Sequence, residues 1–201
     1  MRRVQAGVMA AGLAAMIALL SAGCRSDSSS AGNSGGGLLI NPAFERGADG
    51  HIGAWAFGQH AGERSYSFDI DESTLIINRV GPEPWGQVIQ ILPAAGLAGS
   101  MLEFAAEVSG QFSDESGAPI APTGVGVRIS GMRPDLPAAL GDAVLFTHHG
   151  APALGVGDHD WTVQRVVFEV PEIATEIRLS FRLTMDGTLR VRNPRLVHFT
   201  P

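Results

Sequence analysis

A tryptophan ring can bind a sugar when it is exposed, because a flat aromatic ring stacks on C–H faces while nearby polar groups hydrogen-bond hydroxyls. The chain has three tryptophans. Trp85 lies between Pro84 and Gly86, where a loop enters a strand-like run, so its ring is expected to be partly exposed, as a sugar platform or as a lid on the core. Trp55 and Trp161 begin apolar runs, which favours packing at the core or its rim. Trp55 remains a weaker ligand candidate.

Charged side chains recur at every second position of two other runs. Arg178 and Arg182 share the polar face of one alternating run, and Glu103 and Glu107 share that of another. Such a face is either a polar ligand surface, with both arginines as weak candidates, or an ordinary solvated sheet face. If the two runs become neighbouring strands, we expect their opposite charges to pair.

A cluster of histidines and aspartates lies on a segment rich in Gly and Pro: His148, His149, Asp158, His159 and Asp160. Imidazole and carboxylate groups bind transition metals, but such a loop offers no rigid element to fix their geometry, so we predict no metal site there. The sequence contains no H-E-x-x-H motif. We therefore assign no catalytic residue and expect a protein that is not an enzyme.

The N-terminal segment contains a cysteine that directly follows a run of small residues. Arg2 and Arg3 precede an apolar stretch over residues 8–20, which is the layout of a secretory signal and is short for a membrane span. The ending Leu20-Ser21-Ala22-Gly23-Cys24 is similar to the bacterial lipobox. The resemblance implies cleavage before Cys24, the only cysteine, and attachment of diacylglycerol to its thiol. An ordinary cleaved signal and a retained membrane anchor are the alternatives.

This pattern predicts a signal peptide over residues 1–23, a lipidated Cys24 with a disordered Ser/Gly linker to residue 37, and one domain over residues 38–201. Several acyl chains would hold that domain at a membrane of the cell envelope. Arg25 stands where an Asp would resemble an inner-membrane retention signal, which favours the outer membrane if the host is Gram-negative. A formal charge of −6 and the absence of lysine argue against nucleic acid as a partner.

From Leu38 onward the sequence reads as short alternating runs separated by Gly, Pro, Asp and Asn, which predicts an all-β domain forming a single β-sandwich. Asp186-Gly187 between two such runs predicts a hairpin, and the Pro- and Gly-containing segment 93–99 predicts a loop. The expected strands are Ser65–Ile70, Thr74–Val80, Gly86–Leu92, Met101–Ser109, Val125–Ser130, Ala143–Thr147, Thr162–Val170, Glu176–Met185 and Thr188–Phe199.

The order of several local patterns resembles carbohydrate-binding-module-like jelly rolls of the galactose-binding-domain-like fold. The resemblance spans roughly residues 38–199 and implies a jelly-roll sandwich and a glycan ligand. It rests on the segments Asn41–Glu45, Gly53–Trp55, Pro84–Gln90, Leu97–Phe104, Asp160-Trp161, Val166–Pro171, Ile177–Leu183 and Gly187–Leu196.

The same resemblance implies a place for a structural calcium ion, and this chain departs from the pattern there. Asn193 stands where the closing strand often carries an Asp, which leaves Glu45 and nearby carbonyls as the remaining hard oxygen ligands. Glu45 and Asn193 are therefore weak calcium candidates, and we predict no cofactor. The expected function is that of a lipid-anchored, non-catalytic module that binds carbohydrate. The alternative is a structural or assembly lipoprotein that binds a protein partner through the same domain.

Overall fold

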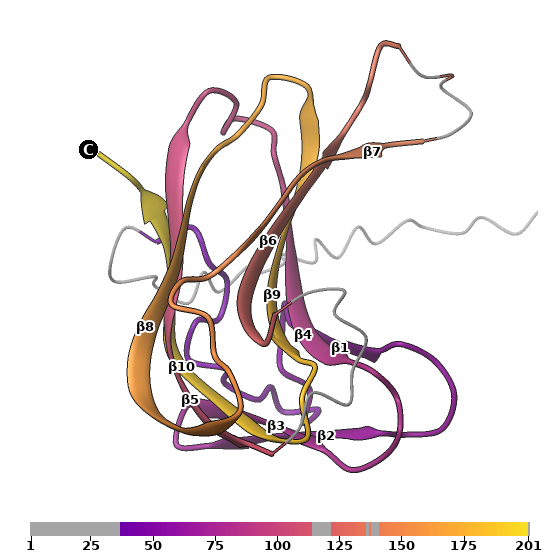
Figure 1. Ribbon diagram of the computed structural model, residues 1–201. Coiled ribbons are helices and arrows are strands. Elements are labelled where there is room, and N and C mark those ends of the chain that lie inside the picture. The colour runs from indigo at the N-terminus through magenta and orange to yellow at the C-terminus, as the bar shows by residue number, and fades with distance from the viewer. Residues whose placement is uncertain (1–36, 114–121, 136, 138–140, 201) are drawn as a thin grey trace, which may run out of the picture. The chain divides into compact units, whose positions relative to one another are not determined.

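The computed structural model describes residues 37–113, 122–135, 137 and 141–200 (Figure 1). The predicted signal peptide, Cys24 and almost all of the predicted linker lie outside these residues. Within the described ranges, no helix has the length and apolar character needed to cross a membrane.

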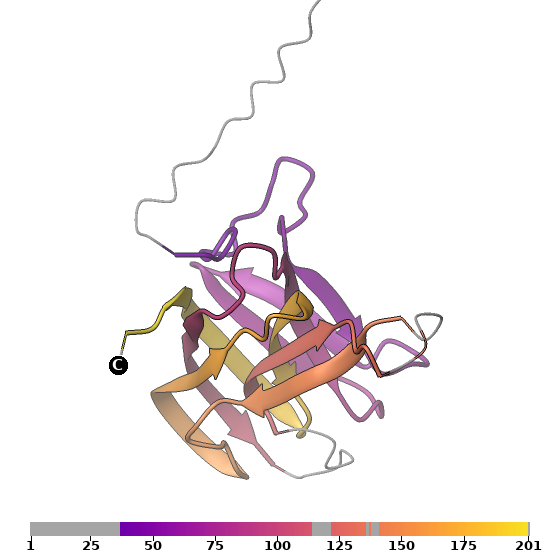
Figure 2. The ribbon, with the colours of Figure 1, turned by 90° about the horizontal axis from the view of Figure 1, so that it is seen from above.

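The described chain is built from strands that form two layers, seen from the side in Figure 1 and from above in Figure 2. Each layer is an antiparallel five-stranded sheet, so the predicted all-β sandwich is confirmed. The strands are β1 (Ala56–Gln59), β2 (Tyr66–Asp71), β3 (Thr74–Arg79), β4 (Gly86–Pro93), β5 (Met101–Phe112), β6 (Gly124–Gly131), β7 (Ala143–His149), β8 (Gly157–Glu169), β9 (Ala174–Leu183) and β10 (Gly187–His198). The first sheet has the order β1-β4-β9-β6-β7, and the second sheet has the order β2-β3-β10-β5-β8.

Strand β9 shows how the sequence determines the two faces of a sheet. Side chains alternate between faces along a strand, and here every second residue is a large hydrophobe. Ile177, Leu179 and Phe181 are fully buried between the sheets. The intervening residues, including Arg178 and Arg182, therefore lie on the outer face of the first sheet. The alternation predicted for this run is confirmed.

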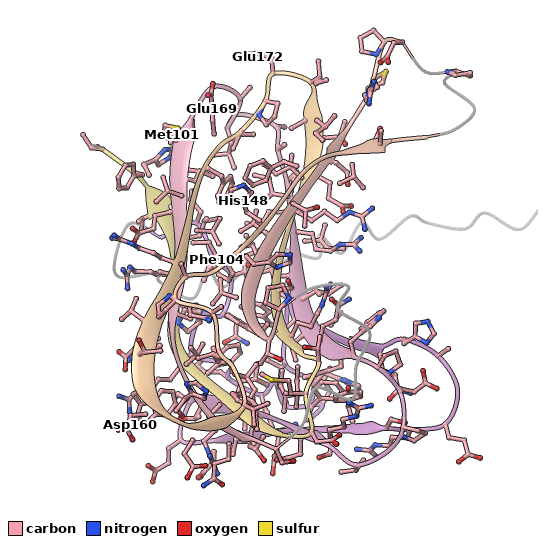
Figure 3. The ribbon with its side chains drawn as sticks, in the orientation of Figure 1. Met101, Phe104, His148, Asp160, Glu169 and Glu172 are labelled. Carbon is pink, nitrogen blue, oxygen red and sulfur yellow. The ribbon has the colours of Figure 1, made fainter. Side chains whose placement is uncertain are left out.

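The centre of the core is a group of aromatic rings contributed by both sheets and by the N-terminal segment. Phe181 of β9 lies 5.5 Å from Phe104 of β5 and 5.5 Å from Trp55, measured between ring centroids. Phe44 completes the group at 5.2 Å from Trp55. Figure 3 shows Phe104 between the two layers. Burying each such side chain stabilises the fold by about 1.5–3 kcal/mol.

The Asn41–Glu45 turn brings Phe44 into this group. Asn41 and Phe44 both have positive φ, 52° and 55°. The Asn41 side chain closes the turn, since its Oδ1 accepts from the Glu45 amide at 2.8 Å and its Nδ2 donates to the Glu45 carbonyl at 2.8 Å. The Asn41 carbonyl in turn accepts from the Trp55 indole at 2.9 Å. Packing of a fully buried Phe44 offsets the unfavourable backbone conformation of this turn.

All nine predicted runs are strands, and the predicted loop over residues 93–99 forms turns after Pro93. Two features were missed. The four residues of β1 are too short to show a periodicity, and β8 begins at Gly157 rather than at Thr162. The first half of β8 is polar and mostly exposed, so it carries no apolar alternation to mark it.

The predicted Asp186-Gly187 hairpin is wrong. Strand β9 pairs with β4 and β6 in the first sheet, whereas β10 pairs with β3 and β5 in the second sheet. The turn therefore carries the chain from one layer to the other. Gly187 has φ of 130°, and a Cβ there would collide with the carbonyl oxygen of Gln111. Glycine is required by this crossing and not by a two-residue hairpin.

A buried glutamine ties β8 to the first sheet. Gln164 is 1% exposed; its Oε1 accepts from the Val125 amide at 2.8 Å, and its Nε2 donates to the Pro152 carbonyl at 2.7 Å. These bonds fix the start of β6 and the segment after β7. The buried hydrophobic residues of the described chain extend from Leu39 to Leu196, so a chain beginning at Leu38 keeps the complete core and all ten strands.

Candidate binding groove

A groove with a volume of about 420 Å³ lies on the outer face of the first sheet. Side chains of β4, β6, β7 and β9 line it, together with Trp85, which precedes β4. The face is therefore built by four adjacent strands whose other face is anchored in the core. Positions on such a sheet are fixed by strand register, which makes the groove largely preformed.

Small residues form the floor of the groove. Register places Ser180 of β9 opposite Gly126 of β6, and Gly126 opposite His149 of β7. Ser180 Oγ donates to the Gly126 carbonyl at 3.2 Å. A Cβ on Gly126 would come within 2.7 Å of that hydroxyl oxygen, so a glycine at this position keeps the floor low and the two strands close.

Arginines rise on both sides of this floor. Arg178 of β9 lies directly opposite Arg128 of β6, two residues along β9 from Ser180. Arg182 lies two residues beyond Ser180 in the other direction and opposite Gln87 of β4. Arg178 and Arg182 are thus separated by roughly 13 Å along the strand. Guanidinium groups at two points of one groove can contact two parts of an extended ligand.

Trp85 stands at the Arg182 side of the groove. The Arg182 guanidinium carbon lies 5.5 Å from the centroid of the Trp85 ring, and Arg182 Nη2 donates to Gln87 Oε1 at 2.8 Å. The edge of the His60 ring approaches Trp85 at 6.0 Å between centroids. Trp85 is half-buried, so part of an aromatic surface lies beside hydrogen-bonding groups.

Two arginine nitrogens of the groove have no hydrogen-bond partner. Within the described residues, Nε of Arg178 and Nε of Arg182 are the buried side-chain polar atoms that no group satisfies. Arg178 makes one ion pair, from Nη2 to Glu176 Oε1 at 3.2 Å, between half-exposed side chains. Buried donors are usually paired, so these two donors are exceptions, and both belong to residues that line the groove.

Burial changes the proton affinity of two groove residues. Desolvation is the main cause that lowers the pKa of Arg182, and the charge of Arg128 lowers it further. Desolvation also lowers the pKa of His149, with smaller contributions from Arg182 and His148. His149 is therefore held toward its neutral form, in which one ring nitrogen donates and the other accepts.

The structure brings together three of the four ligand candidates named from the sequence: Trp85, Arg178 and Arg182 all line the groove. Trp55 does not join them, and its candidacy is corrected. It is 5% exposed, its ring packs on Phe44 and Phe181, and its indole N–H is bonded to a backbone carbonyl. A ring enclosed in this way has no face available for a ligand.

Sequence reasoning missed much of the groove, including Arg128, Gly126 and Gln87. In Gly124–Gly131 the apolar residues alternate with Gly126 and Arg128, so the outward position of these two was readable from the pattern. Their place beside β9 was not, because it depends on pairing between strands about fifty residues apart. Gln87 likewise becomes part of the groove only because β4 pairs with β9, which the sequence pattern does not show.

The condition set for pairing Glu103 and Glu107 with Arg178 and Arg182 is not met, because β5 and β9 belong to different sheets. The acidic residues pair with arginines of their own sheet. Glu103 pairs with Arg195 at 2.9 Å and with Arg165 at 3.8 Å, and Glu107 pairs with Arg192 at 2.7 Å. The principle of cross-strand pairing holds with different partners.

Trp161 lies on the second sheet, on β8, and is 38% exposed. The Arg192 guanidinium covers its ring at 4.1 Å from the centroid. This arrangement agrees with the rim packing expected from the sequence and lies outside the groove lining.

The residues weighed as metal ligands lie apart. Figure 3 shows His148 on β7 and Asp160 at a separate place on β8. His148 stacks on Phe146 at 4.4 Å, and His159 bonds the Gly155 carbonyl at 2.8 Å. Within the described ranges, no three His, Cys, Asp or Glu side chains gather closely enough to hold a metal ion.

The two calcium candidates make other contacts. Glu45 is exposed at the end of the Asn41 turn. Asn193 has φ of 51° at a bulge of β10, and its Nδ2 donates to Glu107 Oε1 at 2.9 Å. This bond contributes most to holding the pKa of Glu107 below its ordinary value, followed by the bond from Arg192. In this structure Asn193 thus stabilises an ionised carboxylate on β5.

No family model and no curated protein sequence matches the chain. Solved structures do. A module described as CBM4 matches with a TM-score of 0.52 at 12% identity, covering 80% of this chain and 99% of that one. The CBM22-1 xylan-binding domain of Paenibacillus barcinonensis Xyn10C matches with a TM-score of 0.50 at 11% identity, covering 82% and 96%.

A third match is the enzymatically active domain of the bacteriophage CBA120 tailspike protein 4, with a TM-score of 0.53 at 11% identity. It covers 82% of this chain but 22% of the tailspike chain, so this chain corresponds to about a fifth of that domain. At such identities the likeness concerns the fold. The chain has the β-sandwich fold of carbohydrate-binding modules.

Proposed function

We propose that the domain is a non-catalytic carbohydrate-binding module whose ligand lies in the groove of the first sheet. The observation that carries this proposal is the arrangement of Trp85 beside Arg182 and Gln87, at the edge of a floor made of small residues. An aromatic surface next to fixed hydrogen-bonding groups suits the apolar faces and hydroxyls of a sugar. The fold shared with carbohydrate-binding modules supports it.

The composition of the groove favours binding over hydrolysis. Glycoside hydrolysis by the common mechanisms uses two carboxylic groups that flank the scissile bond. The residues that line the described groove include arginines, a histidine, a serine and a threonine but no carboxylate. Glu176 lies near one end and is engaged by Arg178.

We further propose that the module is held at the cell envelope through acyl chains on Cys24. The support is the sequence pattern of residues 1–24, with its charged start, apolar stretch and small residues before the only cysteine. Anchoring through several chains would keep the groove close to envelope or surface glycans. Arg25 favours the outer membrane in a Gram-negative host.

The binding proposal is tested with a soluble chain beginning at Leu38 on a glycan array, with Trp85→Ala compared with the wild type. We expect the wild-type chain to bind a subset of glycans and Trp85→Ala to lose roughly tenfold or more in affinity, the value of one stacked ring. Trp161→Ala is the matched control, because it removes a partly exposed tryptophan from the other sheet.

An array on which the folded wild-type chain binds no glycan contradicts the module proposal and favours a protein partner for the same surface. Equal losses in Trp85→Ala and Trp161→Ala would show that the groove does not hold the ligand. Circular dichroism and thermal unfolding of both variants separate loss of binding from loss of fold.

The anchor is tested in the full chain by labelling with a radioactive or clickable fatty acid. The wild type should incorporate the label, and Cys24→Ser should incorporate none and accumulate as precursor or soluble protein. An unmodified cysteine at the mature N-terminus in mass spectrometry, or continued labelling of Cys24→Ser, contradicts lipidation.

A further inference from the structure

The groove has a charge that differs from that of the whole chain. The chain carries a formal charge of −6, yet the described side chains around the groove floor include Arg128, Arg178 and Arg182. Arg128 and Arg178 occupy directly opposed positions of neighbouring strands and point to the same face. Like charges in this position destabilise a sheet.

The protein supplies little counter-charge to these arginines. Within the described residues, Glu176 pairs with Arg178, and no carboxylate pairs with Arg128 or Arg182. The second sheet behaves differently: Arg192 pairs with Glu107, and Arg195 with Glu103. On the second sheet, carboxylates thus neutralise Arg192 and Arg195, whereas the groove of the first sheet holds Arg128 and Arg182 without such a partner among the described side chains.

Buried hydrogen-bond donors without a partner belong to the same groove. The unsatisfied buried nitrogens of the described chain are guanidinium Nε atoms of Arg178 and Arg182. A guanidinium presents its donors in a planar fork that matches the two oxygens of a carboxylate. A ligand carboxylate would supply negative charge and accept from the guanidinium nitrogens that line the groove, whereas a neutral sugar hydroxyl would supply only an acceptor.

We propose that the groove selects acidic glycans, with carboxylates of uronic acid residues held by Arg128, Arg178 and Arg182. This inference rests on the proposed function and adds the class of its ligand. The small floor of Gly126 and Ser180 leaves room for a sugar ring, with Arg128 and Arg178 on one side and Arg182 on the other. The separation of roughly 13 Å between Arg178 and Arg182 suits a polymer with more than one charged residue.

The experiment compares acidic polymers with neutral counterparts of the same backbone. The chain beginning at Leu38 is titrated with polygalacturonate and with its methyl ester, and with alginate and its carboxyl-reduced form, while neutral xylan and galactan complete the panel. We expect at least one acidic form to bind about tenfold or more tightly than its neutral counterpart. The preference should weaken as salt concentration rises.

Arg128→Gln provides the sharpest variant, because removing one of two opposed arginines relieves repulsion. We expect about tenfold weaker binding of the acidic polymer together with unchanged or higher thermal stability. Arg178→Gln should weaken binding similarly. Arg165→Gln is the matched control, since Arg165 is 65% exposed on the second sheet and lies 3.8 Å from its acidic partner; it should leave binding unchanged.

The outcomes separate the two proposals. Equal affinity for acidic and neutral forms, with a loss in Trp85→Ala, overturns acidic selectivity and leaves the carbohydrate module in place. If both Arg128→Gln and Arg178→Gln keep the preference for acidic polymers, the proposal that these groove arginines hold the ligand carboxylates is overturned. A wild-type chain that binds no acidic polymer of the panel overturns acidic selectivity, while the glycan array alone decides the module proposal.

Discussion

The guanidinium of Arg182 lies over the ring of Trp85, with its carbon 5.5 Å from the ring centroid, and the same group donates to Gln87. A residue of the loop before β4 is thereby tied to β9. A cation over an aromatic face stabilises by about 0.5–1 kcal/mol at exposed sites and by about 2 kcal/mol when desolvated. Burial partly desolvates the charge of Arg182, and this desolvation is the main cause of its lowered pKa.

A double-mutant cycle measures this contact. Trp85→Ala and Arg182→Met, in which Met retains an apolar stem, should show a coupling of about 0.5–2 kcal/mol in the free energy of unfolding. Denaturant unfolding of the two single variants and the double variant gives the value. In the control cycle of Trp85→Ala with Arg165→Met, effects should add within about 0.5 kcal/mol. Equal coupling in both cycles would contradict a specific contact.

Gly86 follows Trp85 and should not tolerate a side chain. A Cβ at this position would overlap the ring of Tyr66, which is 1% exposed and cannot move away without disturbing the core. Gly86→Ala should therefore lower the free energy of unfolding by about 1–3 kcal/mol. Gly58→Ala is the control, since Gly58 lies on the adjacent β1 and its Cβ would meet nothing within 4 Å. A loss of similar size in Gly58→Ala would point to a general cost of alanine in these strands.

Tyr66 reports on the same region through its ionisation. Desolvation raises the pKa of its phenol to about 12, and its hydroxyl donates to the Glu83 carbonyl at 3.0 Å. The unfolded chain loses this proton near the ordinary pKa of 10, so unfolding is favoured increasingly as pH rises from about 10 toward 12. Tyr66 is the only tyrosine, so the absorbance of tyrosinate follows it alone. Folded protein that ionises near pH 10 would contradict this burial.

The sequence was sufficient for features that depend on one strand. Strict alternation placed Arg178 and Arg182 on an outer face, and the position of Trp85 between Pro84 and Gly86 indicated a ring at a loop–strand junction. Both inferences need only the two-residue period of a strand and local turn chemistry.

Features that depend on which strands are neighbours were beyond the sequence pattern. Glu103 lies on an outer face, as alternation requires, but it pairs with Arg195 because β10 lies beside β5. Trp55 begins a strand-like segment as Trp85 does, yet Phe44 and Phe181 enclose it through contacts that bring three distant segments together. Such contacts are set by packing of the whole core and not by local periodicity.

His149 links the charge of the groove to pH. Desolvation is the main cause that lowers the pKa of His149 below the ordinary 6.5, and the charges of Arg182 and His148 lower it further. The unfolded chain therefore binds a proton at this residue more readily than the folded chain does. The stability contribution of neutral His149 is complete above about pH 6.5 and is lost as pH falls through the lowered pKa. His149→Gln should flatten this part of the curve of unfolding free energy against pH.

The same group tests the ligand class. A bound carboxylate would offset the charge of Arg182 and raise the pKa of His149, so binding of an acidic polymer should take up protons and strengthen as pH falls from about 7 toward 5.5, while uronic carboxylates stay ionised. Proton NMR of the His149 ring, with and without ligand, measures the shift directly. A neutral glycan is the matched control, and its binding should leave the pKa of His149 unchanged. An acidic glycan that binds in the groove and lowers the pKa would be incompatible with carboxylates placed beside Arg182.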